Sequence, residues 1–305
     1  MKKVFRFSIF ILILIALVGC QTVTQPADVK VAYTDGLGRS VELPVELKSI
    51  VSLAPSNTEL LYAVGAGAQV TARDEFSNFP EEATKLPSVG GSMGNYSVEQ
   101  IVALKPDLVL AAEINTPELV KSLEDAGVKV YYLKNPVNLE GLFTNLETVG
   151  TITGHSADAD KLIASLKARI DAVKVKAATV TEKPRVFYEL DATDPAKPWT
   201  PGPGSFVNEL IGLAGAENVA ANLDMAWAQM SLEALLVADP QIILLGDAAY
   251  GVLPESLKDR AGWENITAVK EGAIHAFNDD TVSRPTPRLV DGLEEMFKLF
   301  HPEVK

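Results

Sequence analysis

The chain has 305 residues, of which 40 are Asp or Glu and 27 are Lys or Arg, so its formal net charge is −13 at pH 7. A chain this acidic repels phosphate backbones, which argues against nucleic-acid binding. Its single cysteine excludes an internal disulfide, and its three histidines are isolated in sequence, so no His-x-x-x-His or Cys-x-x-Cys metal site is present.

The first 19 residues are predicted to be a signal peptide. Its first residues include three positively charged side chains, Lys2, Lys3 and Arg6. The apolar run 9–18 that follows is only about half as long as a membrane-spanning helix requires. The run ends in Leu17-Val18-Gly19-Cys20, which resembles the bacterial lipobox. We therefore expect cleavage before Cys20 and lipidation of Cys20, with residues 20–28 as a polar tether to the folded part.

From residue 29 onward, short β-rich runs alternate with helical stretches, which is the pattern of an α/β fold. Segment 50–66 is matched by 185–216, since each contains a strand and then a helix with Glu, five residues and Gly-Ala. Segment 97–110 is matched by 231–244, each with a serine N-cap, a short helix, a proline and a buried strand. The repeat predicts two similar α/β lobes with central sheets, residues 29–152 and 181–305, and a ligand cleft between them.

One long helix is expected to join the lobes within residues 153–180. Apolar residues recur there at three- and four-residue steps, namely Ala159, Leu162, Ile163, Leu166, Ile170 and Val173. A helix of this length, about 30 Å, is a stiff connector that permits only a modest hinge motion.

The segments 51–59 (Val-Ser-Leu-Ala-Pro-Ser-Asn-Thr-Glu) and 104–109 (Leu-Lys-Pro-Asp-Leu-Val), together with the single linker helix, resemble the helical-backbone class of ABC-importer substrate-binding proteins. Within that class, segments 76–80, 227–233 and 280–288 are most similar to the cobalamin-binding members. The resemblance implies a monomeric, lipid-anchored, extracytoplasmic binding protein that is not an enzyme. It would deliver a corrinoid, which carries its own cobalt, to a permease dimer with its ATPase subunits, and it would need no cofactor.

Catching a corrinoid requires flat apolar surfaces for the ring faces and a few hydrogen-bonding groups for the amide arms. The candidate ligand-binding residues are Phe76, Met93, Tyr96, Trp199, Trp227, Asp280 and Arg284. Trp199 stands in a Pro- and Gly-rich segment that predicts a loop. Met93 and Ala112 stand where cobalamin binders of the class have tryptophans, so the pocket is expected to be less aromatic on the first lobe.

Two glutamates at equivalent repeat positions, Glu99 and Glu233, fall in the first turn of a helix. The helix dipole favours a carboxylate there, and the resemblance implies a further role, in which one glutamate per lobe docks on the two-fold permease. Glu59 and Glu209 are also matched in the repeat, but they stand inside helices, and we expect them to face solvent.

Other functions remain open from the sequence. Anionic siderophores call for several cations, for which Arg284, Arg288 and Arg73 are the candidates. Haem calls for an axial Tyr or His, for which Tyr96 and Tyr188 are the candidates, whereas His275 is expected to be structural. A membrane-anchored enzyme of cell-envelope metabolism is the alternative outside transport.

Overall fold

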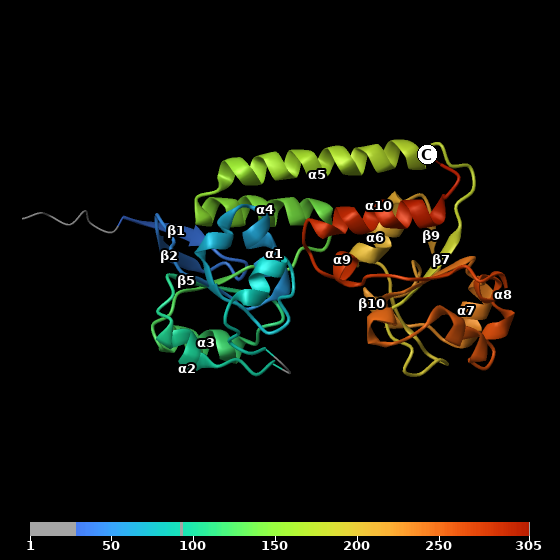
Figure 1. Ribbon diagram of the computed structural model, residues 1–305, viewed down its shortest axis with the longest axis horizontal. Helices are drawn as coiled ribbons and strands as arrows, with labels where there is room; N and C mark the ends of the chain where they lie inside the picture. Colours follow the sequence, from blue (N-terminus) through green and yellow to red (C-terminus); the bar gives the residue numbers. More distant parts are fainter. Residues whose placement is uncertain (1–28, 92–93, 305) are drawn as a thin grey trace, which may run out of the picture.

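The computed structural model describes residues 29–91 and 94–304. The predicted signal peptide, Cys20, the tether and Met93 lie outside the described residues. The described chain forms two lobes side by side, and helices along one side of the molecule connect them (Figure 1). None of the helices described is both long enough and apolar enough to cross a membrane.

The first lobe is built on a parallel sheet in the order β4-β3-β5-β6. Its strands are short and apolar, and β5 is buried along its whole length, as expected for a parallel sheet covered on both faces. The strands are β3 (Ile50–Ser52), β4 (Val70–Ala72), β5 (Leu108–Ala111) and β6 (Val130–Tyr132), preceded by the antiparallel hairpin β1 (Lys30–Thr34) and β2 (Ser40–Pro44). The helices are α1 (Pro55–Ala63), α2 (Val98–Ala103), α3 (Pro117–Asp125) and α4 (Leu139–Thr153), with 3₁₀ turns η1 (Ala66–Gln69) and η2 (Glu81–Lys85).

The second lobe repeats this plan with a parallel sheet in the order β12-β11-β7-β9. The strands are β7 (Arg185–Glu189), β9 (Glu217–Asn218), β11 (Ile242–Leu245) and β12 (Ile274–Ala276), and a separate antiparallel ribbon pairs β8 (Trp199–Pro201) with β10 (Trp227–Gln229). The helices are α6 (Phe206–Leu213), α7 (Leu232–Ala238), α8 (Thr267–Glu271), α9 (Asp280–Ser283) and α10 (Arg288–Phe300), with 3₁₀ turns η4 (Gly246–Tyr250), η5 (Pro254–Asp259) and η6 (Trp263–Asn265). The predicted fold class, two α/β lobes with central parallel sheets, is confirmed.

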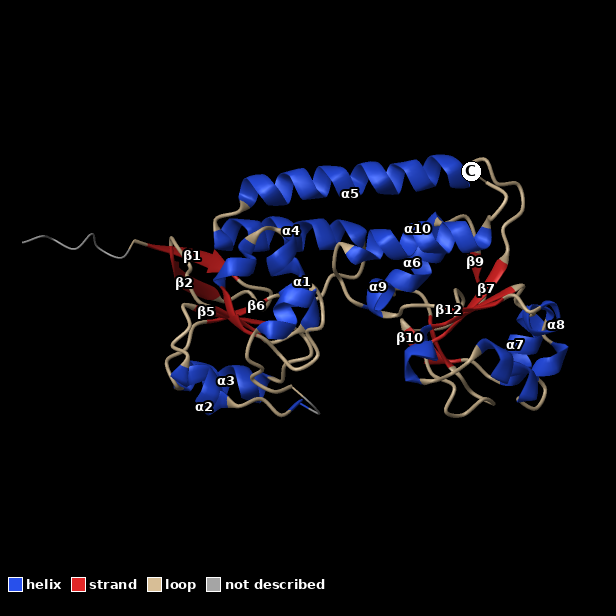
Figure 2. Ribbon diagram, viewed as in Figure 1, coloured by secondary structure: helices blue, strands red, loops and turns tan. Residues whose placement is uncertain are grey.

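Helix α5 (Ser156–Ala177) runs along both lobes, and α4 and α10 both pack against it (Figure 2). It follows a glycine C-cap, Gly154, whose φ of 80° ends α4 in the left-handed region. Its buried residues are Ala159, Ile163, Leu166, Ile170 and Val173, all members of the predicted apolar face. These residues belong to one hydrophobic core that also takes in side chains of α1, α4, α6 and α10, so the core is continuous from one lobe to the other.

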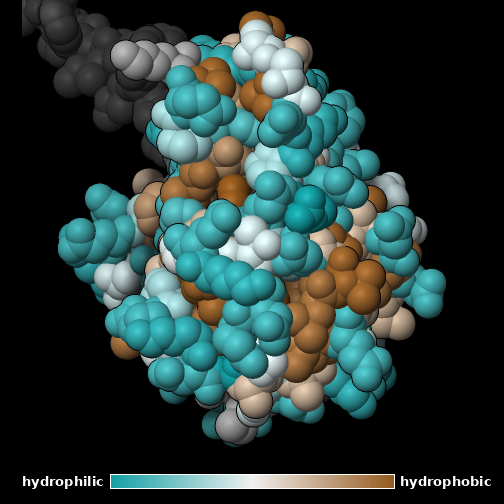
Figure 3. Space-filling model, turned by 90° about the vertical axis from the view of Figure 1, so that its right-hand side faces the viewer, coloured by the Kyte–Doolittle hydropathy of each residue, from teal (hydrophilic) through white to brown (hydrophobic). Residues whose placement is uncertain are grey.

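The end face of the second lobe is mainly hydrophilic, with smaller hydrophobic areas between the polar side chains (Figure 3). The sequence therefore concentrates its apolar residues in the two sheets and the helices that cover them.

Candidate ligand-binding site

An open cavity of about 510 Å³ lies beyond the carboxyl ends of β7, β11 and β12 in the second lobe. It is lined by Leu190, Asp191, Trp199, Gly246, Tyr250 and Asp279. In open parallel sheets this is the edge at which ligands bind, because the loops there vary without disturbing the strands. A larger cavity of about 820 Å³ lies on the first lobe near α3, but none of the candidate ligand-binding residues borders it.

Two tryptophans form an exposed aromatic face beside this cavity. In the β8–β10 ribbon Trp199 pairs with Gln229 and Pro201 pairs with Trp227, so both tryptophans lie diagonally on the same face. Each indole residue is 41% exposed, whereas Thr200 between them on the opposite face is fully buried. The prediction of a loop at Trp199 was wrong. Pro201 is tolerated because the ribbon has only two strands and the proline stands at the end of one.

The cavity has two acidic lining residues, Asp191 and Asp279. The buried hydroxyl of Tyr188 donates a 2.7 Å hydrogen bond to Asp279 Oδ1, and burial raises the pKa of both groups. Gly246 lies against the Tyr188 ring, where a Cβ atom would approach to 2.6 Å, so only glycine fits. Asp247 follows with a buried Oδ1 that has no hydrogen-bond partner among the described residues, and burial raises its pKa as well.

Arg260 donates two hydrogen bonds, at 2.6 and 2.8 Å, to the carboxyl group of the fully buried Glu189. Burial and the neighbouring Asp247 raise the pKa of Glu189 to about 7, although Arg260 acts in the opposite direction. The arginine is therefore committed to the interior and offers no cation to the cavity.

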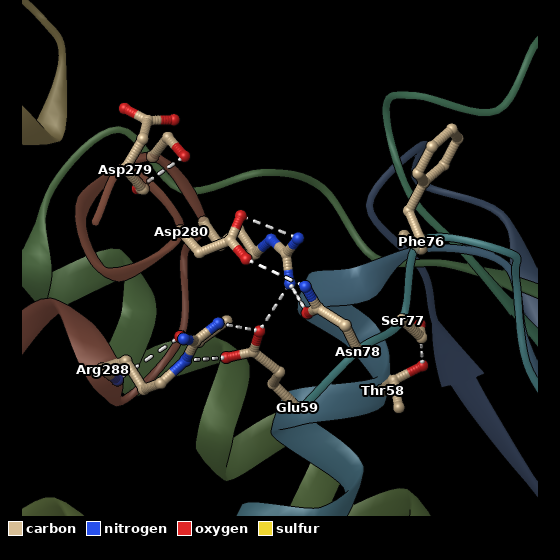
Figure 4. Close-up of polar contacts among 12 residues, drawn as sticks. Thr58, Glu59, Phe76, Ser77, Asn78, Asp279, Asp280 and Arg288 are labelled. Atoms are coloured by element: carbon tan, nitrogen blue, oxygen red, sulfur yellow. Dashed lines mark hydrogen bonds and ion pairs between the residues drawn. The ribbon is translucent and has the colours of Figure 1, made fainter. Parts of the chain in front are cut away.

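On the first lobe, a tight turn after β4 presents Phe76. The buried carboxylate of Asp74 accepts hydrogen bonds from the backbone N–H of Phe76 and from Ser77 Oγ, and Ser77 in turn contacts Thr58 Oγ1 at 2.7 Å. The Phe76 ring is half exposed and points away from this turn (Figure 4).

Tyr96 is only partly buried, but its hydroxyl is already engaged. It donates a 2.9 Å hydrogen bond to the Leu53 carbonyl, and burial raises its pKa to about 12. The tyrosine ring also closes on Gly91, whose φ of 128° suits glycine alone. Its hydroxyl therefore serves the loop structure, and only its ring remains for a ligand.

Polar side chains of the two lobes meet at Glu59. Glu59 Oε1 accepts a 3.1 Å hydrogen bond from Arg284, and both carboxylate oxygens accept from Arg288 (Figure 4). Glu59 is only 3% exposed, so the expectation that it faces solvent was wrong. The reason is tertiary, because the other lobe brings two arginines onto this face of α1, Arg284 directly after α9 and Arg288 at the start of α10.

The matched Glu209 also differs from expectation. It is partly buried, and its Oε2 accepts a 3.0 Å hydrogen bond from the backbone N–H of Leu139, the first residue of α4. Glu59 likewise contacts the first residue of α10, Arg288, so each repeat glutamate reaches a helix start in the other half of the molecule. The equivalent positions of Glu59 and Glu209 in the sequence repeat were the feature from which this shared contact could have been predicted.

The pair Asp280–Arg284 lies beside the Glu59 contact. Arg284 Nη2 is 2.8 Å from Asp280 Oδ1, so these two candidate ligand-binding residues pair with each other. Both also hydrogen bond across the lobes to Asn78, a residue that we did not single out from the sequence. Tyr250, 89% exposed at the cavity rim, was missed as well, and its position shortly after a buried strand was the available signal.

Glu99 and Glu233 are both exposed in the first turns of α2 and α7. Each follows a serine cap, Ser97 or Ser231, whose Oγ accepts a hydrogen bond from the backbone N–H of the residue directly after the glutamate. Neither carboxylate forms an ion pair within the described part of the chain. Figure 1 shows α2 and α7 on the side of their lobes away from α5.

The described residues contain no group of three or more side chains arranged to hold a metal ion. His275 lies on β12, partly buried, and burial lowers its pKa.

Comparison of the sequence and the structure with those of known proteins identifies the family of this chain. Residues 50–281 match the family model described as periplasmic binding protein. An ABC transporter substrate-binding lipoprotein of Bacillus subtilis, YvrC, is 33% identical over 99% of both chains, and a vitamin B12-binding protein of Vibrio parahaemolyticus is 31% identical over 84% of this chain and 90% of the relative. The solved periplasmic heme-binding protein RhuT of Roseiflexus sp. RS-1 is 27% identical, with a TM-score of 0.75 over 84% of this chain and 98% of that one. The resemblance inferred from the motifs is thereby confirmed, and the chain belongs to the periplasmic binding protein family as the substrate-binding protein of an ABC importer, not as an enzyme.

Proposed function

We propose that this substrate-binding protein captures a corrinoid between its lobes and delivers it to a permease dimer with its ATPase subunits. In this proposal Cys20 carries the lipid that holds the protein on the outer side of the membrane, and the folded part acts as a monomer. Glu99 and Glu233 provide one docking carboxylate on each lobe.

The observation that carries the corrinoid proposal is the shared exposed face of Trp199 and Trp227. Two large apolar rings on one face, next to an open cavity, suit a broad flat ligand better than a small polar one. Phe76 offers a further exposed ring from the first lobe. The name of the Vibrio relative, a vitamin B12-binding protein, supports the same ligand class.

The charged side chains near the cavity argue against an anionic siderophore as the ligand. Arg284 and Arg288 are bound to Glu59, and Arg73 donates to the backbone carbonyls of Asp74, Ala83 and Thr84. The cavity itself is lined by Asp191 and Asp279. A ligand with several negative charges would meet carboxylates and committed arginines, whereas a corrinoid presents neutral amides.

Haem is the second candidate, because the Roseiflexus neighbour is a heme-binding protein. Of the tyrosines considered from the sequence, Tyr96 donates its hydroxyl to Leu53 and the fully buried Tyr188 donates to Asp279, so neither is poised as an axial ligand. Tyr250 at the cavity rim favours haem, since an exposed phenol can ligate iron.

Calorimetric titration of the purified chain with cyanocobalamin, haemin and a ferric catecholate siderophore tests the proposal. We expect cyanocobalamin to bind most tightly. Tighter binding of haemin, abolished by Tyr250→Phe, would replace the corrinoid assignment with haem. For the anchor, Cys20→Ser should release the protein from the membrane fraction, and retention of that variant in the membrane would reject lipidation.

A further inference from the structure

The side-chain amide of Asn78 is bound at both ends by residues of the opposite lobe (Figure 4). Its Nδ2 donates to Asp280 Oδ2 at 3.2 Å, and its Oδ1 accepts from Arg284 Nη1 at 2.7 Å. A carboxylate acceptor beside a guanidinium donor is the hydrogen-bonding complement of a primary carboxamide. The second lobe therefore presents a two-point carboxamide site, and an asparagine of the first lobe occupies it.

The two recognising residues are held in place independently of Asn78. Asp280 and Arg284 pair with each other at 2.8 Å, and Glu59 holds Arg284 from the first lobe at 3.1 Å. The side chains of Arg284 and Asp280 are 16% and 32% exposed, so they are partly shielded but still reachable. Removal of the asparagine amide would leave this donor–acceptor pair assembled and open to solvent.

Of the residues in this group, Asn78 is the one whose side chain can most readily be displaced. It is exposed, and both of its hydrogen bonds are solvent-accessible. By contrast, the contact between Glu59 and Arg288 is largely shielded from solvent and also joins the lobes, so the lobes remain connected when Asn78 moves away. An exposed hydrogen bond of this kind contributes little net free energy, because water replaces it readily.

We propose that Asn78 is a built-in competitor that fills a carboxamide subsite until a primary carboxamide of the ligand displaces it. The inference rests on the proposed corrinoid function and deepens it, since it assigns one amide arm of the ligand to Asp280 and Arg284. A carboxylate in place of that amide would be repelled by Asp280, and an N-substituted amide would lose the donor that Asp280 accepts. The subsite therefore selects neutral primary amides. A ligand amide binds there only if its hydrogen bonds to Asp280 and Arg284 outweigh those of Asn78.

The test compares cyanocobalamin binding by the wild-type chain and by Asn78→Ala. Because the variant has no competing amide, we expect its dissociation constant to fall roughly three- to tenfold. Asn145→Ala is the matched control, since Nδ2 of the partly buried Asn145 also donates a solvent-accessible hydrogen bond, to the carbonyl of Lys134, outside this site. It should leave the dissociation constant unchanged.

Two further arms separate competition from a merely structural role. The gain in ligand affinity caused by Asn78→Ala should vanish in an Asp280→Ala background. It should also vanish for corrinoids whose peripheral amides have been hydrolysed to carboxylates. Unchanged or weaker binding of cyanocobalamin by Asn78→Ala would overturn the inference while leaving the corrinoid assignment intact. Absence of cyanocobalamin binding to both proteins would reject the corrinoid assignment, and the carboxamide subsite with it.

Discussion

The carboxylate of Glu59, on α1 of the first lobe, accepts a 2.8 Å hydrogen bond from Nε of Arg288, the first residue of α10 in the second lobe. The Arg288 guanidinium also stacks over the Phe79 ring at 4.4 Å. The glutamate is almost fully buried, and Arg284 contacts the same carboxylate, so two arginines of the second lobe meet one glutamate of the first. The contact fixes the position of one lobe relative to the other next to the candidate cleft.

Replacement Glu59→Gln should lower the free energy of unfolding by about 3 kcal/mol, since it leaves two partly buried arginines without their anion. Urea denaturation at pH 7 measures the loss. Asp125→Asn, which breaks the exposed pair between Lys121 and Asp125, is the control and should change stability little. Equal effects of the two replacements would show that the interlobe pair adds nothing beyond a surface ion pair.

The raised pKa of Glu189 makes stability depend on pH. The folded state holds the proton up to about pH 7, whereas an unfolded glutamic acid loses it near its model value of 4.5. The stabilisation is therefore complete below about pH 4.5 and disappears as the pH rises through 7, on the order of 1 to 3 kcal/mol. Melting temperatures of the wild type should fall between about pH 4.5 and 7, the interval between the two pKa values, and Glu189→Gln should flatten that slope. A slope that is identical in the variant would assign the pH dependence to other groups.

Glu99→Lys combined with Glu233→Lys should abolish uptake while leaving the ligand dissociation constant unchanged, because both carboxylates are exposed on α2 and α7 and neither borders the cavity. Uptake of labelled ligand by cells and calorimetry of the purified protein provide the two readouts. Glu147→Lys, an exposed glutamate on α4, is the matched control and should transport normally. Loss of ligand binding in the double variant would place these residues in the pocket.

The continuous core along α4, α5 and α10 resists a wide closure of the lobes, since opening it would expose buried side chains such as Leu146, Leu166 and Leu293. Small-angle scattering of the free and ligand-saturated protein should therefore give nearly the same radius of gyration. A large decrease on ligand binding would show that the lobes close by a hinge that this core permits.

Sequence patterns predicted the fold well because they report local physics. Apolar periodicity identified α5, and the repeat identified two lobes, since each depends on residues that are close in sequence. The site was predicted only in part. Glu59 was assigned to solvent because the arginines that cover it are more than 220 residues away, and the strand at Trp199 exists because β10 pairs with it. Contacts between distant segments, such as Asn78 with Asp280, have no local pattern that would reveal them.

The exposed tryptophan face is tested most directly by the dissociation constant of cyanocobalamin for Trp227→Ala, measured by calorimetry beside Trp263→Phe. Trp263 is fully buried against Phe187, so its replacement should lower the melting temperature and leave affinity unchanged. We expect Trp227→Ala to keep the wild-type melting temperature and to weaken binding by about 2 kcal/mol, roughly thirtyfold. An unchanged dissociation constant together with a lower melting temperature would mean that Trp227 packs for stability only, and it would contradict a corrinoid bound on this face.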